Sequence, residues 1–119
     1  MKSVISALWA EHHTLFYALI VLVILDYITG ICLAVKEKRV SSKIGAQGIA
    51  KKIMIFVLVA VSAVVDRILL SNGNALLPVT ILFYCTNELI SILENARTAG
   101  LPMPEKLTAL LKQLKLKNR

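Results

Sequence analysis

Three acidic residues, Asp26, Asp66 and Glu88, lie inside long runs of apolar residues. If these runs cross a membrane, a carboxylate near the bilayer centre costs about 2.5–3.5 kcal/mol and needs water, a partner or a proton. Such groups can hold helices together through ion pairs and hydrogen bonds. They can also exchange protons along a path through the membrane. The residue types alone leave both interpretations open.

The runs that carry these acids are long enough to be membrane-spanning helices. Hydrophobic residues make up 57% of the 119 residues, above the usual share in soluble domains. A helix of about 20 residues crosses about 30 Å of hydrocarbon. The candidate spans are residues 14–35, 53–70 and 75–96. The sequence therefore predicts an all-α membrane protein with three transmembrane helices in a single domain, residues 1–119.

Each predicted span has a polar face. In the first span Asp26, Thr29 and Gly30 form a polar, narrow patch that another helix could approach closely. In the second span Ser62 lies one turn before Asp66, which we expect to face inward, while Arg67 extends to the headgroups or pairs with another segment. The third span carries a polar stripe that consists of Thr80, Tyr84, Asn87, Glu88, Ser91, Glu94 and Asn95. We expect this stripe to face water or the interior of an assembly.

A strongly basic segment, residues 36–52, separates the first two apolar runs. Its six basic residues are Lys36, Lys38, Arg39, Lys43, Lys51 and Lys52. Short loops rich in Lys and Arg stay on the cytoplasmic side of the membrane. This predicts a multi-pass membrane protein with its N-terminus outside, its C-terminus in the cytoplasm, and an outer turn at residues 71–74.

Both ends of the chain suit the membrane interface. Residues 3–10, with Trp9, favour a short interfacial helix or an outer extension of the first span. Residues 104–117 predict an amphipathic helix with leucines on one face and a basic surface that consists of Lys106, Lys112, Lys115 and Lys117. This helix could lie on the anionic cytoplasmic leaflet or pack with the same helix of neighbouring subunits.

Other classes of function lack support in the sequence. There is no Ser-His-Asp set, paired catalytic carboxylate, phosphate-binding loop or metal-ligand spacing, so we predict neither an enzyme nor a cofactor. The adjacent His12 and His13 diverge around a helix and do not make a metal site. Cys32 and Cys85 lie in apolar runs, where thiols act as small hydrophobes. The basic residues come without a nucleic-acid recognition motif.

Several residues go beyond what periodicity explains: Asp26-Tyr27 with Gly30, the stretch SSKIGAQGIAKK at 41–52, and NELISILEN at 87–95 followed by Gly100, Pro102 and Pro104. In this order they resemble the phage lysis and toxin-secretion holin family, from about residue 24 to residue 114. The resemblance implies a small phage or prophage protein that oligomerises in the host membrane. It further implies lesions that release a murein hydrolase or a large toxin, without necessary direct contact with that cargo.

Two further expectations concern the depth of the acidic residues in the membrane and the alternative functions. Asp26 and Glu88 lie equally far along their spans from the outer side, counted from Thr14 and Leu76, so we expect the first and third spans to meet through them. A small proton-coupled transporter or ion channel is the main alternative function, because membrane carboxylates serve such proteins. A membrane-anchored adaptor would leave the buried acids unexplained.

Overall fold

The computed structural model describes residues 2–69 and 76–117, with side chains from residue 12 onward. It contains four helices: α1 (Lys2–Lys36), α2 (Ser42–Ile68), α3 (Leu76–Thr98) and α4 (Glu105–Lys117). By length and apolar composition, three of them can cross a membrane, over His12–Lys36, Ser42–Ile68 and Leu76–Thr98. No strand occurs among the residues described. The prediction of an all-α protein with three membrane spans and a shorter C-terminal helix is confirmed.

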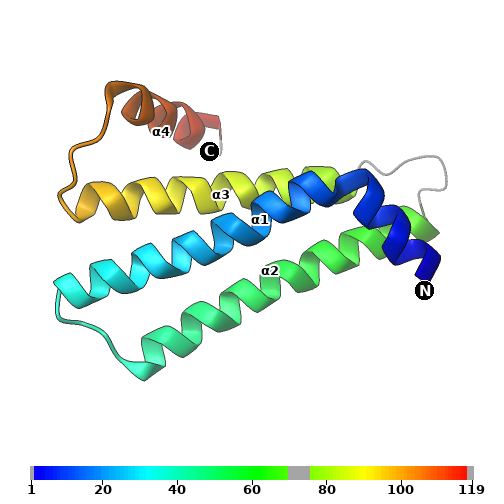
Figure 1. Cartoon of the computed structure of the whole chain (residues 1–119), viewed down its shortest axis with the longest axis horizontal. Coiled ribbons are helices and arrows are strands. Elements are labelled where there is room, and N and C mark those ends of the chain that lie inside the picture. The colour runs from blue at the N-terminus through cyan, green and yellow to red at the C-terminus, as the bar shows by residue number, and fades with distance from the viewer. Residues whose placement is uncertain (1, 70–75, 118–119) are drawn as a thin grey trace.

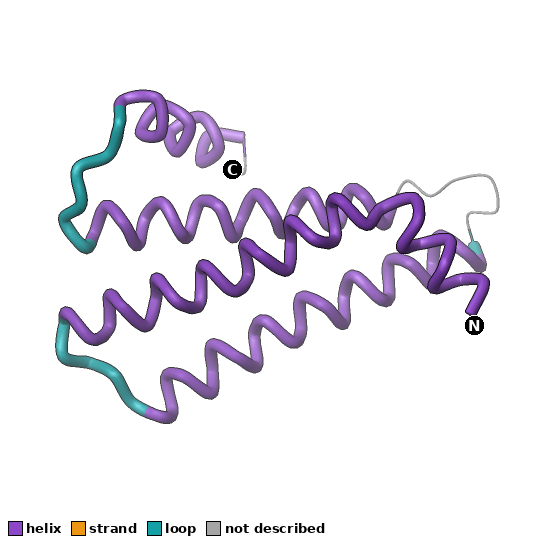
Figure 2. The backbone as a smooth tube through the Cα atoms, viewed as in Figure 1, coloured by secondary structure: helices purple, strands orange, loops and turns teal. Residues whose placement is uncertain are grey.

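The three long helices form a bundle that is open at one end. α1 and α3 run in the same direction and make the most extensive contact, while α2 runs in the opposite direction (Figure 1). α2 meets α3 near residue 76 and diverges from it toward the end where α1 finishes. Figure 2 places the connections 37–41 and 99–104 at that same open end. The two basic parts of the chain therefore leave the bundle on one side.

Local hydrogen bonds fix the helix ends. The Ser41 side chain accepts a bond from the Ile44 N–H at 3.1 Å, which caps the start of α2. α3 ends in a Schellman motif, in which Leu101 N–H binds the Ala96 carbonyl and Gly100 has the left-handed φ of 89° that glycine favours. The same motif ends α1, where Lys38 occupies the left-handed position with φ 56°. Both connections at the open end are thus tightly turned.

A buried apolar core lies toward the other end of the bundle. It consists of Leu19, Val23, Val59, Ala63, Leu77 and Ile81, all buried. The outward apolar side chains are exposed on every long helix, among them Ile28 on α1, Val61 on α2 and Phe83 on α3. A soluble protein would bury such a surface, whereas lipid tails solvate it at no penalty. The exposed apolar surface agrees with three membrane spans.

The structure decides one boundary and corrects another. Residues 3–10 follow the second of the two alternatives, an outer extension of the first span, because α1 continues without a break from Lys2, although its first turns are angled against the rest (Figure 1). The basic segment 36–52 is not all loop, because α2 begins at Ser42 and contains Lys43, Lys51 and Lys52. The Ser41 cap starts the helix before the apolar run begins. The predicted turn at 71–74 lies outside the described residues.

Candidate functional site

The site is organised around Lys52, whose ammonium group joins two carboxylates between the spans. Lys52 Nζ lies 2.5 Å from Asp26 Oδ2 and 2.6 Å from Glu88 Oε1. Asp26 and Glu88 are 8% and 5% exposed, and the three residues come from α1, α2 and α3. We call Asp26, Lys52 and Glu88 the charge cluster. Because each carboxylate has a cationic partner, the cluster reduces the cost of placing acids within the bilayer.

Close helix packing next to the charge cluster sets its geometry. Tyr27, directly after Asp26, donates a hydrogen bond to the Gly45 carbonyl at 3.3 Å. A Cβ atom at Gly48 would lie 3.2 Å from the Tyr27 ring, so the ring packs on the bare backbone of α2. Gly45, Gly48 and Lys52 recur at three- and four-residue spacing and share one face of α2. The face that admits Tyr27 therefore also brings Lys52 to Asp26.

The polar stripe of α3 extends the cluster toward the open end. Asn95 Nδ2 donates to Asp26 Oδ1 at 3.3 Å and to Thr29 Oγ1 at 3.0 Å. The Cβ position of Gly30 lies 3.8 Å from Asn95 Nδ2, an ordinary contact distance. Lys36 Nζ also donates to the Ala99 carbonyl next to the end of α3. α1 and α3 thus meet at Asp26 through Asn95, whereas Asp26 and Glu88 are joined through Lys52 of α2.

A second polar contact joins α2 and α3 at the opposite end. The Asp66 carboxylate accepts hydrogen bonds from the N–H groups of Leu76 and Leu77, at 3.1 and 2.7 Å. These are the first two residues of α3, whose unpaired N–H groups and positive dipole end favour an anion. Ser62 Oγ lies 2.8 Å from Thr80 Oγ1. Asp66 faces inward as expected, while Arg67 is exposed.

The C-terminal helix folds back on α3 (Figure 1). Its Leu111 is 1% exposed, and Lys115 Nζ lies 3.4 Å from Glu94 Oε2 near the end of α3. The other basic residues predicted for this helix, Lys106, Lys112 and Lys117, are exposed. The apolar face of α4 thus packs on its own chain, an arrangement that neither sequence-based alternative included.

Within one chain the α3 stripe is largely an inter-helix surface. Thr80, Glu88, Glu94 and Asn95 bind groups on α2, α4 and α1, as described above. Tyr84 packs against the apolar core. Ser91 lines a cleft, described below, and Asn87 is partly buried. The expectation that the stripe faces water or the interior of an assembly concerns assembled copies and stays a prediction, whereas in the single chain neighbouring helices contact most of the stripe.

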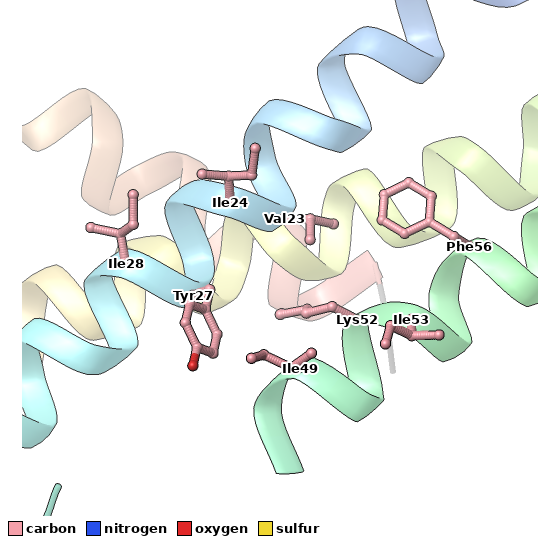
Figure 3. A pocket seen from close by; sticks show the side chains of 8 residues that line it. All are labelled: Val23, Ile24, Tyr27, Ile28, Ile49, Lys52, Ile53 and Phe56. Carbon is pink, nitrogen blue, oxygen red and sulfur yellow. The ribbon is translucent and has the colours of Figure 1, made fainter. Parts of the chain in front are cut away.

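Two hollows flank the contact between Tyr27 and α2. One is an apolar groove of about 260 Å³ between α1 and α2, which Figure 3 shows with Ile24, Ile28 and Phe56 along its walls. The other is a cleft of about 270 Å³ at the open end, with Asp26, Lys52, Ser91 and Asn95 in its lining. The cleft thus places polar side chains beside the charge cluster at the open end, whereas the apolar core lies toward the other end.

The sequence did not predict the role of Lys52, which we had assigned to a cytoplasmic loop. The available signal was the helical spacing of Lys52 from Gly45 and Gly48, which becomes informative once the helix is known to begin at Ser42.

The other basic residues of segment 36–52 lie at the open end. Lys36 donates to the Ala99 carbonyl next to the end of α3, whereas Lys38, Arg39, Lys43 and Lys51 are exposed. No three His, Cys, Asp or Glu residues gather as metal ligands within the described ranges.

This chain resembles known proteins over nearly its whole length. The bacteriophage holin family matches residues 3–116. An uncharacterized protein of Halalkalibacterium halodurans is 39% identical and covers 97% of this chain and 88% of its own. An uncharacterized protein of Clostridium perfringens is 47% identical, over 81% and 73% of the two chains. A probable holin of Bacillus phage phi105 is 38% identical, over 76% and 66%. No solved structure matches.

Proposed function

Because this chain belongs to the bacteriophage holin family, we propose that it oligomerises in the bacterial cytoplasmic membrane and opens lesions there. A murein hydrolase or a large toxin would leave the cell through these lesions, which leads to lysis or secretion. The cargo needs no direct contact with the protein. The family is a membrane-permeabilising one, and no enzymatic activity is proposed.

The observation that carries the proposal is that apolar side chains pack the bundle at the end opposite the cleft. Leu19, Val59 and Ile81 belong to a buried apolar core there, whereas the cleft beside Asp26 lies at the other end. This packing favours a permeable path that forms between copies of the chain. This supports an assembly of many subunits rather than a pore through a single bundle.

We infer that the open end of the bundle faces the cytoplasm. The connection that contains Lys38 and Arg39 and the segment that leads to α4 leave the bundle at this end. Positively charged connections are retained on the cytoplasmic side. The N-terminus then lies outside, and the exposed lysines of α4 face the anionic lipid headgroups of the cytoplasmic leaflet.

The cargo sets the scale of the assembly. A compact hydrolase domain of about 200 residues has a radius of gyration near 16 Å and hence a width of roughly 40 Å. If one helix about 10 Å wide per subunit lines the lumen, the ring needs on the order of a dozen to two dozen subunits. We propose α3 as the lining helix, because it carries the longest polar stripe.

Lining a lumen requires α3 to give up contacts that it makes in the single chain. Glu88 would leave Lys52, and Asn95 would leave Asp26 and Thr29. Water in the lumen can replace these partners, which lipid cannot. The proposed opening is therefore a rearrangement of packed helices, and the charge cluster holds the closed arrangement until enough copies assemble.

The deciding experiment is controlled expression in bacteria that also produce a folded cytoplasmic reporter of hydrolase size. Membrane potential and reporter release are recorded together. We expect the potential to collapse and the reporter to appear outside the cell at the same time. Collapse of the potential with the reporter retained would reject the wide lesion.

A small ion channel or proton-coupled transporter is the second candidate. It is favoured by the buried charge cluster, in which two carboxylates share one ammonium group. In that case the purified protein in liposomes should move protons or small cations but retain an enclosed protein. Passage of a small cation without passage of a folded protein indicates a channel or transporter, whereas passage of both indicates a lesion.

A further inference from the structure

The cleft at the open end combines two features that a lipid headgroup needs. Its lining includes the cationic side chains of Arg39 and Lys51 and the apolar side chains of Ile31 and Ile44. These residues come from the end of the bundle where α2 diverges from α1 and α3 (Figure 1), the end that we propose faces the cytoplasm. We propose that this cleft binds the phosphate headgroup of an anionic phospholipid from the cytoplasmic leaflet.

Cationic donors line the cleft beside the Asp26 carboxylate. Asp26 shares the ammonium group of Lys52 with Glu88 and also accepts a hydrogen bond from Asn95, so its charge is partly compensated within the protein. Lys51 forms no ion pair within the described part of the chain. Arg39 binds Glu37 through Nε at 2.6 Å, which leaves its two terminal nitrogens as donors. Lys51 and Arg39 therefore offer donors for an anion in the cleft.

The size and position also fit a headgroup. A volume of about 270 Å³ would hold about nine water molecules at about 30 Å³ each, which is ample for a phosphate group. Basic pockets between membrane helices on the cytoplasmic side suit anionic headgroups. A phosphate at Arg39 can accept a bidentate pair of hydrogen bonds. The attached acyl chains would remain in the hydrocarbon next to α2.

Such a lipid would act on the fold as well as bind to it. It would fill the wedge between α2 and the α1–α3 pair and hold these helices apart at the open end. Lys51 on α2 and Arg39 before it would then share one phosphate, next to the charge cluster. Binding of this lipid goes beyond the proposed lesion function, and its assignment to the cytoplasmic leaflet rests on the orientation proposed above.

The test uses the full chain, purified in a neutral detergent and titrated with phosphatidylglycerol or phosphatidylethanolamine of the same acyl chains. Bound lipid is counted by native mass spectrometry. The test variant is Arg39→Gln with Lys51→Gln. The matched control is Lys38→Gln with Lys43→Gln, which removes the same charge at the same end outside the cleft lining. The assay contains no bilayer, so neither insertion orientation nor permeabilisation affects it.

We expect the unaltered chain to prefer phosphatidylglycerol and the test variant to bind it about tenfold more weakly, since two charge-assisted contacts are lost. The control should stay close to the unaltered chain. Equal loss in both variants would mean diffuse charge attraction and overturn the proposal. Full displacement by millimolar inorganic phosphate would assign the cleft to a small anion instead. Unchanged lipid binding with an altered subunit number would assign it to a second copy of the chain.

Discussion

The ring of Tyr27 on α1 packs directly on the backbone of α2 at Gly48. A Cβ at position 48 would lie 3.2 Å from Cε1 of the ring, closer than most such contacts in proteins. This contact lies one helical turn from Lys52 on the same face of α2. The packing of Tyr27 therefore sets how far Lys52 reaches toward Asp26.

Gly48→Val should destabilise the bundle by about 1–3 kcal/mol, because a branched side chain cannot fit below the ring without moving it. Gly48→Ala should be nearly neutral, since a small ring shift is offset by a better helix propensity of about 1 kcal/mol. Thermal unfolding in detergent, followed by circular dichroism, measures both. The control Ala46→Val, at an exposed position of α2, should change little. Equal effects at 46 and 48 would contradict the contact.

Lys52→Met should be among the most destabilising substitutions, at about 3–5 kcal/mol, because it leaves two buried carboxylates without a cation. Adding Asp26→Asn and Glu88→Gln to the same chain should restore much of this loss. Lys43→Met, at an exposed position, is the matched control. The four chains are compared by thermal unfolding in detergent. A triple variant no more stable than Lys52→Met alone would show that the three charges are not coupled.

Glu88→Gln should make permeabilisation start earlier after induction, whereas Leu82→Ala should leave the onset close to that of the unaltered protein. Glu88 is buried and bound to Lys52, and a hydrogen bond to a charged group is worth about 1.5–3 kcal/mol to the closed arrangement. Leu82 is half-exposed toward lipid, where a smaller side chain loses little. The onset of dye entry after induction measures the effect. If both variants act at the same time as the unaltered protein, Glu88 has no role in opening.

Asp66→Ala should destabilise the junction of α2 and α3 by about 1–2 kcal/mol, because two N–H groups at the start of α3 lose their acceptor. Asp66→Asn should cost less, since its amide oxygen still accepts one bond. Arg67→Gln is the control, as Arg67 is exposed. Hydrogen exchange of the α3 amides in detergent localises the change. Faster exchange at the C-terminal end of α3 alone would contradict the capping role.

The orientation is tested by cysteine labelling in intact cells. After Cys32 and Cys85 are replaced by Ala, single cysteines are placed at Asn72 and at Ser42. A membrane-impermeant thiol reagent added outside should label position 72 and leave position 42 unreacted until the cells are opened. This pattern follows from retention of the basic connection inside. Labelling of 42 with protection of 72 would reverse the topology.

The sequence by itself determined the fold class and the number of spans. Long apolar runs that contain few charges admit only helices in a membrane, since every backbone polar group must be satisfied within the segment. Helical spacing alone also predicted the inward face of Asp66 and the meeting of the first and third spans at Asp26 and Glu88. These features depend on local periodicity, which can be read without knowing what lies next to each helix.

Only the tertiary structure decided which partner each polar group takes. Lys52 looked like a loop residue because it directly precedes an apolar run, yet the Ser41 cap places it inside α2, where it reaches two acids from other helices. The sequence showed a polar stripe on α3 but not its partners in the single chain, which come from α1, α2 and α4. Periodicity shows that a face is polar, but pairing depends on the positions of residues far apart in the chain, which only packing establishes.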